Sequence, residues 1–260
     1  MVMIERPDAV VTALRGLAAA APSGLEDKLF GSWSIAPSRL GEMFVVGTRA
    51  GVQFVRSVES MHSDEAAFAE AYRVRFGRPL RPTDRAPGGL LAALAGRPGG
   101  AVQLDLSGSS EFEKAVLAAT RRIPNGQTRP YAWVAREAGR PRAVRAVGTV
   151  LARNPVPLLV PCHRVVRADG GLGQYMFGPA QKEQLLRAEG ANLDEVAELA
   201  AHGVHYLGSD TTGVVCFPTC RDARRITAPH RHGFRTFADA TAAGYRPCLH
   251  CRPGADPVPA

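Results

Sequence analysis

Five cysteines divide into a group of four and one that stands alone, and the two sets suit different chemistry. The group has the spacing C-x3-C followed by C-x2-C and consists of Cys216, Cys220, Cys248 and Cys251. Thiolates at this spacing can surround one Zn²⁺ ion tetrahedrally. The fifth, Cys162, has no thiol partner and lies beside His163, so it is a candidate reactive thiol in a reducing cytoplasm.

The isolated thiol needs a base, because an unperturbed cysteine has a pKa of about 8.5. His163 can take the proton directly or through a water. Glu183 or Glu189, on the next predicted helix, can hold the imidazole. Valines flank the motif, which predicts a buried site, and an inert buried Cys162 is the alternative.

The segments around Cys162 are predicted to be helical. Ser110 and Glu113 form a capping box before an apolar helical face. Residues 131–138 and 143–152 are predicted helices joined by a tight glycine-containing turn, and Thr128 can cap the first of them. This pair is typical of a helix-turn-helix. Further helices are predicted at residues 181–189 and 193–201.

The first third of the chain has mixed patterns. Alternating apolar runs at residues 42–47 and 51–58 predict a β-hairpin, and Ser63 is predicted to cap a helix that ends at Phe76. Other predicted elements are a helix at residues 90–95 and a strand at 102–106. A short amphipathic helix, rather than a secretory signal, is predicted at residues 9–21 because Arg15 interrupts the apolar run. No apolar stretch is long enough to span a membrane.

The net charge of +8 falls almost wholly in one segment. Residues 1–105 hold 12 basic and 11 acidic residues, residues 106–192 hold 13 and 6, and residues 193–260 hold 7 and 7. The segment with Cys162 therefore carries +7, which favours a polyanionic partner such as DNA, with plain solubility charge as the alternative.

An ordered series of motifs from Phe112 to Gly190 resembles the O6-alkylguanine-DNA alkyltransferases, also called methylated-DNA–protein-cysteine methyltransferases. The motifs are Arg122-Ile123-Pro124-Asn125-Gly126-Gln127-Thr128, Arg145-Ala146-Val147-Gly148, Asn154-Pro155, Pro161-Cys162-His163-Arg164-Val165, Gly171-Leu172-Gly173-Gln174-Tyr175, Lys182 and Leu185-Leu186-Arg187-Ala188-Glu189-Gly190. The resemblance implies that an alkyl group moves irreversibly, once per molecule, from a flipped O6-methylguanine to Cys162. O4-methylthymine stays open as a second substrate.

The resemblance also assigns roles to single residues. His163 would deprotonate Cys162 through a water, with Glu189 orienting the imidazole. Tyr131 would contact the flipped guanine, and Asn154 would order the loop before the active site. DNA would be contacted by Arg145, which fills the gap left by the base, and by Thr128, Ala143, Gly148 and Arg164. The alkyl pocket would be formed by Val160, Tyr175, Met176 and Phe177.

Two departures from the family pattern affect the pocket and the tail. Met176 and Phe177 are bulkier than the residues usual there, so we expect a narrow pocket that prefers methyl to larger groups.

The tail resembles the zinc domain of the bacterial adaptive-response protein Ada, in which the first cysteine, here Cys216, also accepts methyl from DNA methylphosphotriesters. Phe217 replaces the usual arginine, and a purely structural zinc module is the alternative.

Together these features predict an α+β protein. The resemblance implies an RNase H-like α/β domain at residues 1–106, a mainly helical alkyltransferase domain at 107–192, a linker at 193–203 and a zinc domain at 204–260. We expect a monomeric, single-turnover methyltransferase that acts in the bacterial cytoplasm, on nucleoid DNA containing alkylated guanine, and holds one Zn²⁺. The alternatives are a non-enzymatic DNA-binding regulator or lesion-recognition protein, and a Cys-His-Glu hydrolase.

Overall fold

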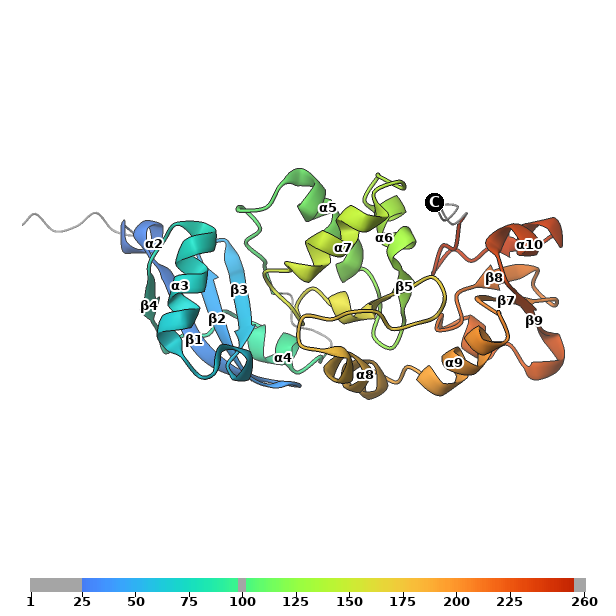
Figure 1. The fold of residues 1–260 in the computed structure, drawn as a ribbon, viewed down its shortest axis with the longest axis horizontal. Coiled ribbons are helices and arrows are strands. Elements are labelled where there is room, and N and C mark those ends of the chain that lie inside the picture. The colour runs from blue at the N-terminus through green and yellow to red at the C-terminus, as the bar shows by residue number, and fades with distance from the viewer. Residues whose placement is uncertain (1–24, 98–101, 255–260) are drawn as a thin grey trace, which may run out of the picture.

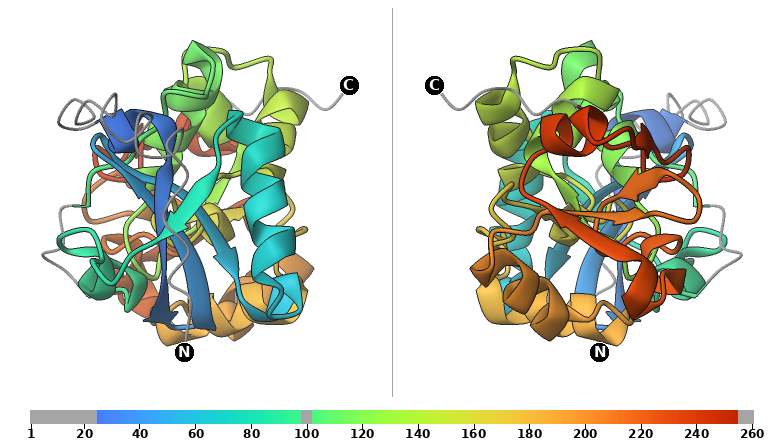
Figure 2. Two further views of the ribbon diagram at one scale, coloured as in Figure 1. Left: turned by 90° about the vertical axis from the view of Figure 1, so that its left-hand side faces the viewer. Right: turned by 90° about the vertical axis from the view of Figure 1, so that its right-hand side faces the viewer.

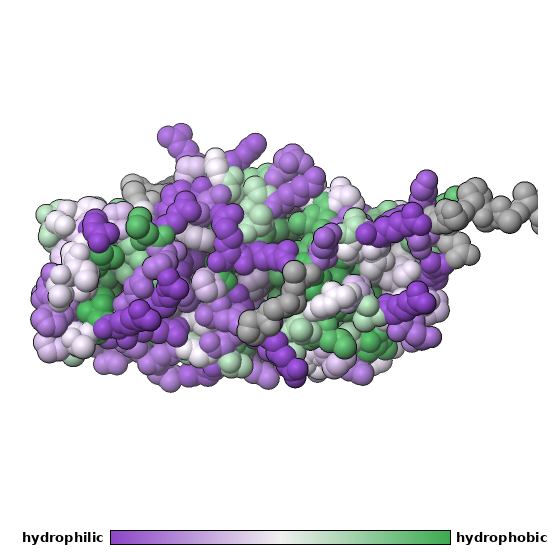
Figure 3. Space-filling view, turned by 180° about the vertical axis from the view of Figure 1, so that it is seen from behind, coloured by the Kyte–Doolittle hydropathy of each residue, from purple (hydrophilic) through white to green (hydrophobic). Residues whose placement is uncertain are grey.

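Three parts of the chain follow one another along the long axis of the molecule, as Figure 1 shows. The computed structural model describes residues 25–97 and 102–254. The helix predicted at residues 9–21 lies outside these ranges. Within them, no helix has both the length and the apolar character needed to cross a bilayer. Hydrophilic side chains cover most of the face in Figure 3, with hydrophobic ones in patches between them.

The N-terminal part is a four-stranded sheet with strand order β3-β2-β1-β4. Its elements are α2 (Leu25–Leu29), β1 (Gly31–Ser38), β2 (Gly41–Thr48), β3 (Gly51–Ser57), α3 (Glu65–Phe76), β4 (Leu80–Pro82) and α4 (Leu90–Leu94). The predicted hairpin is confirmed as β2 and β3, which pair antiparallel with Val45 opposite Val55. Figure 2 shows α3 lying across one face of this sheet.

Two predictions for this part were wrong in detail. Asp64, not Ser63, caps α3, because its carboxylate accepts from the amides of Ala66 and Ala67 at 2.8 and 3.0 Å. The strand predicted at residues 102–106 is a single bridge between Val52 and Leu104. The side chain of Asp105 accepts the backbone amide of Ser107 and turns the chain away from the sheet.

The middle part is mainly helical. It contains α5 (Glu111–Arg121), β5 (Arg129–Pro130), α6 (Tyr131–Glu137), α7 (Val144–Ala152), a 3-10 turn (Cys162–Arg164), β6 (Val165–Val166) and α8 (Pro179–Ala188). The capping box of Ser110 and Glu113 is present, and α6 and α7 form the predicted helix pair. Thr128 does not cap α6, because the backbone there is the short strand β5 paired with β6.

The C-terminal part begins with α9 (Leu193–Ala201) and forms a second four-stranded sheet with order β10-β8-β7-β9. Its elements are β7 (Tyr206–Ser209), β8 (Val214–Cys216), a 3-10 turn (Ala223–Arg225), a 3-10 turn (Ala228–His230), β9 (Arg231–Phe234), α10 (Phe237–Ala242) and β10 (Arg246–Pro247). The predicted α+β class is therefore confirmed. One apolar core runs from the middle part into this sheet.

Candidate functional site

The loop before Cys162 is held by one asparagine. Asn154 follows the end of α7, and its side-chain amide donates to the carbonyl of Val160 at 3.0 Å and to the Cys162 sulfur at 3.3 Å. Its carbonyl oxygen accepts the amide of Val156 at 3.0 Å. Asn154 is fully buried, so these bonds are shielded from water. The loop and the thiol are thus both bonded to the side chain of Asn154.

Cys162 sits in an environment that favours the neutral thiol. It is 6% exposed, and burial raises its pKa above the ordinary value, although the bond from Asn154 and the charge of Lys182 work against this shift. Burial in turn lowers the pKa of Lys182 to about 8, and its ammonium donates to the carbonyl of Val165 at 2.6 Å. The sulfur therefore needs a base at the moment of reaction.

His163 and Glu189 form a buried pair and are the candidates for that base. Nε2 of His163 lies 2.9 Å from Oε1 of Glu189, and both side chains are almost wholly buried. Burial lowers the pKa of His163, while the carboxylate opposes the shift, so the ring is neutral near pH 7 and able to take a proton. Among the described residues nothing bonds Nδ1, and no hydrogen bond joins the ring to the Cys162 thiol. Proton transfer from sulfur therefore requires an intervening water.

Glu189 is anchored from several directions. Arg164 donates from Nε and Nη2 to its two oxygens at 2.8 and 2.9 Å, and Arg39 donates to Oε1 at 2.9 Å. The backbone amide of Gly126 donates to Oε2 at 3.3 Å. Burial alone would raise the pKa of Glu189, but the bonds from His163 and Arg164 outweigh it and hold the pKa well below the usual range.

Sequence reasoning did not find the role of Arg39. This residue follows β1 and reaches Glu189 across 150 positions of sequence. No motif surrounds Arg39, and its function depends on how the N-terminal sheet docks on the middle part. A long-range contact of this kind leaves no local signal in one sequence.

Two tyrosines stand near the thiol. Burial, and then the neighbouring Cys162, raise the pKa of Tyr131, so its hydroxyl keeps its proton. The Tyr175 ring packs edge-on against His163 at 6.1 Å and against Phe177 at 5.5 Å, and its buried hydroxyl has no partner among the described residues. Met176 is half-buried in the same loop.

The predicted pocket residue Val160 is fully buried, and its carbonyl already accepts bonds within the protein. The donors are the side chain of Asn154 and the backbone amide of Cys162, at 3.0 and 2.8 Å. The carbonyl of Cys162 accepts the amide of Val165.

The residues expected at DNA fall into two groups. Arg145 is exposed on α7, and Ala143 and Gly148 are half-buried at its start and in its middle. Thr128 and Arg164 are buried, and both form hydrogen bonds within the protein. Thr128 bonds Thr219 of the C-terminal part, and Arg164 bonds Glu189 and the carbonyl of Ile123.

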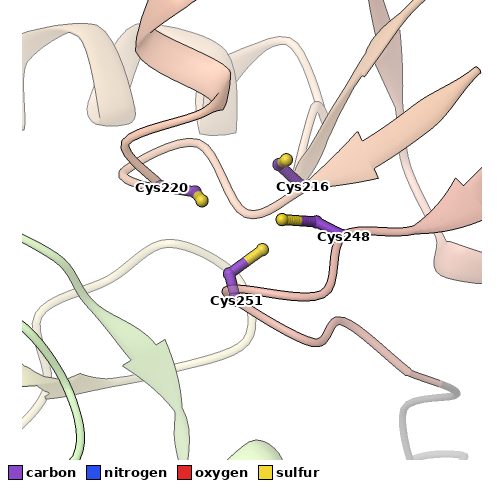
Figure 4. A group of neighbouring side chains, drawn as sticks. All are labelled: Cys216, Cys220, Cys248 and Cys251. Carbon is purple, nitrogen blue, oxygen red and sulfur yellow. The ribbon is translucent and has the colours of Figure 1, made fainter. Parts of the chain in front are cut away.

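The four remaining cysteines converge. Their sulfurs point toward one another from two loops, as Figure 4 shows, and all lie within 4.8 Å of one another. The four side chains are buried and unoxidised, and they are Cys216, Cys220, Cys248 and Cys251. Four buried thiols at this separation fit a single tetrahedral Zn²⁺, which would bind them as thiolates. The predicted ligand set is brought together in full.

Cys216 and Cys248 line an open cavity of about 410 Å³, whereas Cys220 and Cys251 do not. Arg225, Arg246 and Thr212 line the same cavity. Phe217, which stands where the Ada pattern has arginine, is buried and stacks over the guanidinium of Arg129 at 5.4 Å. The positive charge at this cavity therefore comes from Arg225 and Arg246, and not from position 217, where the Ada pattern has arginine.

These features combine a buried cysteine beside a helix-turn-helix with a four-cysteine metal module. Residues 111–191 match the family model described as 6-O-methylguanine DNA methyltransferase, DNA binding domain. Residues 196–254 match the metal binding domain of Ada. A methylated-DNA–protein-cysteine methyltransferase of Methanosarcina acetivorans is 35% identical over 171 residues, which are 61% of this chain and 98% of that protein.

Two further comparisons agree. The bifunctional transcriptional activator/DNA repair enzyme Ada of Escherichia coli is 46% identical over 89 residues, 34% of this chain and 25% of that protein. A crystal structure of an OGT variant from Mycobacterium tuberculosis matches with TM-score 0.50 and 30% identity over 62% of this chain and 93% of that chain. The match spans about a quarter of the length of the Escherichia coli Ada protein and about half of the length of several other relatives. It belongs to the methylated-DNA–protein-cysteine methyltransferase family.

Proposed function

We propose that this protein repairs O6-methylguanine in duplex DNA by taking the methyl group onto Cys162. The observation that carries the proposal is the relay itself: a buried thiol held by Asn154, with a buried His163–Glu189 pair whose Nδ1 is free to accept a proton. A thiol with a neutral imidazole in the next position along the chain supports methyl transfer over DNA binding alone.

The reaction balances with groups of this chain. His163 takes the thiol proton through a water, and the sulfur attacks the methyl carbon as the carbon–oxygen bond breaks. The electron pair stays with guanine O6, and the Tyr131 hydroxyl donates a hydrogen bond to the base as charge develops. The product is a thioether that water does not easily displace, so each molecule reacts once.

The target carbon lies inside the base stack, so the nucleotide must be extruded before it reacts. Arg145 would fill the gap from the minor groove, with Ala143 and Gly148 facing the DNA backbone, and the exposure of Arg145 on α7 supports this role. The relay is built within one chain, which supports a monomer, and five free cysteines support a reducing cytoplasm, where chromosomal DNA is the substrate.

The test is the mass of the intact protein and its peptides after mixing with duplex DNA that contains O6-methylguanine. We expect one methyl group, on Cys162, and none in Cys162→Ala. An unmodified Cys162, together with normal DNA binding, would favour the non-enzymatic regulator or lesion-recognition protein. Turnover of an ester substrate would instead favour the hydrolase.

The cavity beside Cys216 favours a second acceptor site for DNA methylphosphotriesters. Its arginines, Arg225 and Arg246, can hold the phosphate next to the sulfur, and the cavity is open to solvent. Incubation with methylphosphotriester DNA should place a methyl on Cys216 and on neither Cys248, which lines the same cavity, nor Cys220, the matched ligand outside it. If Cys216 stays unmodified, the module is structural.

A further inference from the structure

Gly126 connects the C-terminal part to the catalytic relay. Its amide donates to Oε2 of Glu189 at 3.3 Å, and its carbonyl accepts a bond from Nη2 of Arg224. Arg224 lies in the 3-10 turn Ala223–Arg225, which begins three residues after the metal-ligand cysteine Cys220. A Cβ on Gly126 would lie 2.4 Å from the carbonyl oxygen of Glu189, and its φ of +67° also favours glycine. Gly126 therefore fits closely between Glu189 and Arg224.

The metal-binding loops rest on the segment that follows Gly126. Thr219, one residue before Cys220, accepts the backbone amide of Thr128 at 2.8 Å. The carbonyl of Cys251 accepts the indole Nε1–H of Trp133 at 2.9 Å. Both loops that carry the metal ligands therefore touch the alkyltransferase part directly.

Arg129 completes this contact. Its buried guanidinium lies between the rings of Trp133 and Phe217, at 5.7 and 5.4 Å from their centroids. It donates to Gln127 Oε1 and to the carbonyl of Thr128, both at 2.7 Å. A four-thiolate zinc centre carries net negative charge, so a nearby buried guanidinium stabilises the docked arrangement.

The segment between α5 and α6 has few bonds of its own that could fix Gly126. Gln127 closes one turn by donating its amide to the carbonyl of Pro124 at 3.2 Å. Arg164 holds the carbonyl of Ile123 and the side chain of Asn125 just before this turn. Gly126 itself is bonded to Glu189 on one side and to Arg224 on the other.

We propose that the metal-loaded C-terminal module is a positioning element for the alkyl-transfer relay, acting through Arg224 and Gly126 on Glu189. The inference rests on the proposed methyl transfer to Cys162. A module of this size takes much of its folding free energy from its metal, so loss of Zn²⁺ undocks the loops and releases Gly126. Glu189 then holds His163 less firmly, and the thiol loses its base.

The test compares wild type, Arg224→Ala, Arg224→Lys and Arg235→Ala in the full chain. Arg235 is an exposed arginine of the same module, and among the described residues no hydrogen bond or ion pair to it is found, so Arg235→Ala is the matched control. The rate of Cys162 methylation by O6-methylguanine DNA is followed by peptide mass from about pH 7 to about pH 9. We expect Arg224→Ala to be about three- to tenfold slower near pH 7, with Arg224→Lys in between.

The pH profile separates positioning from simple destabilisation. As the pH rises toward about 9, hydroxide competes with His163 as the acceptor of the thiol proton, so the defect of Arg224→Ala should shrink. A defect of equal size at every pH, or a wild-type rate at every pH, overturns the proposal. A wild type that never methylates Cys162 overturns the proposed function instead, so the two failures are distinguishable.

Zinc removal supplies a readout that does not depend on activity. The chain has two tryptophans, Trp33 and Trp133, so Trp33→Phe leaves the interface tryptophan as the only fluorophore of its kind. Chelation of Zn²⁺ should shift Trp133 emission to the red as its contact with Cys251 opens. After chelation, the wild type should methylate Cys162 at the rate of Arg224→Ala. Chelation should slow Arg224→Ala only slightly further. Unchanged emission, or independent additive effects, refutes the coupling.

Discussion

Replacing Glu189 with glutamine removes the negative charge of the side chain and keeps its size, so it tests the contribution of the charge alone. The carboxylate accepts hydrogen bonds from His163, Arg164, Arg39 and the amide of Gly126, and its side chain is 1% exposed. An amide of the same size keeps one acceptor oxygen and turns an NH₂ group toward donors. At least one guanidinium then faces a group that cannot accept its bond.

The size of the effect follows from burial. Removing one partner of a buried ion pair typically costs about 3–5 kcal/mol, because the other charge stays buried without compensation. The side chains of Arg39 and Arg164 are 17% and 10% exposed, and Arg164 keeps its bond to the carbonyl of Ile123. We therefore expect Glu189→Gln to lose about 3 kcal/mol of unfolding free energy near pH 7.

The assay is urea unfolding followed by tryptophan fluorescence, with Glu183→Gln as the matched control. Glu183 lies on the same helix, α8, and pairs with Arg187, but its side chain is 47% exposed. A solvated pair of this kind contributes roughly 0–1 kcal/mol. Both substitutions change a carboxylate to an amide, and they differ in how deeply the side chain is buried.

The pH dependence has a defined sign. The folded pKa of Glu189 is depressed, so its contribution is fully present above the unfolded pKa of about 4.3 and is lost as pH falls toward the folded value. The stability difference between wild type and Glu189→Gln should therefore shrink between about pH 5 and about pH 3, by at most roughly 1.4 kcal/mol per unit. A loss no larger than that of Glu183→Gln, or a difference that stays constant over this range, refutes the reasoning.

Three further results are expected. Asn154→Ala should lower stability by about 2 kcal/mol and slow methylation of Cys162 at least tenfold, since three buried bonds and the loop order are lost; chemical unfolding and single-turnover rates measure both, and an unchanged rate contradicts the role of Asn154. Arg39→Ala should slow methylation about fivefold while DNA affinity stays constant, because Arg39 acts on Glu189; a gel-shift titration alongside the rate shows whether binding is the cause. Met176→Ala should raise the rate with O6-benzylguanine roughly tenfold relative to methylguanine, and equal rates for both bases in the wild type would contradict a narrow pocket.

Features fixed by neighbours in sequence were predictable. The capping box of Ser110 and Glu113 and the helix pair α6–α7 depend on side chains within one or two turns, and both are present. The four metal ligands were also predictable, because their spacing alone specifies the chemistry. At Asp64 the prediction missed by one residue, since Ser63 and Asp64 are both good caps and the backbone decides between them.

Features set by docking between parts of the chain were not predictable. Thr128 was expected at DNA, yet it bonds Thr219, 91 residues away. Arg164 was expected at DNA as well, yet its guanidinium lies inside the relay. An arginine in a basic segment has the same local signal whether it faces solvent or a buried carboxylate, and only the tertiary contact separates the two.

All three parts of the chain meet at Glu189. The N-terminal sheet reaches it through Arg39, the middle part through His163 and Arg164, and the C-terminal module lies behind Gly126. Enzymes that turn over repeatedly must open to release product, and this limits how firmly an active site can be held. A protein that keeps the methyl group on its own sulfur has no product to release from that site. Rigid support of the relay from every side therefore carries no kinetic penalty, and loosening any one support should slow the single transfer step.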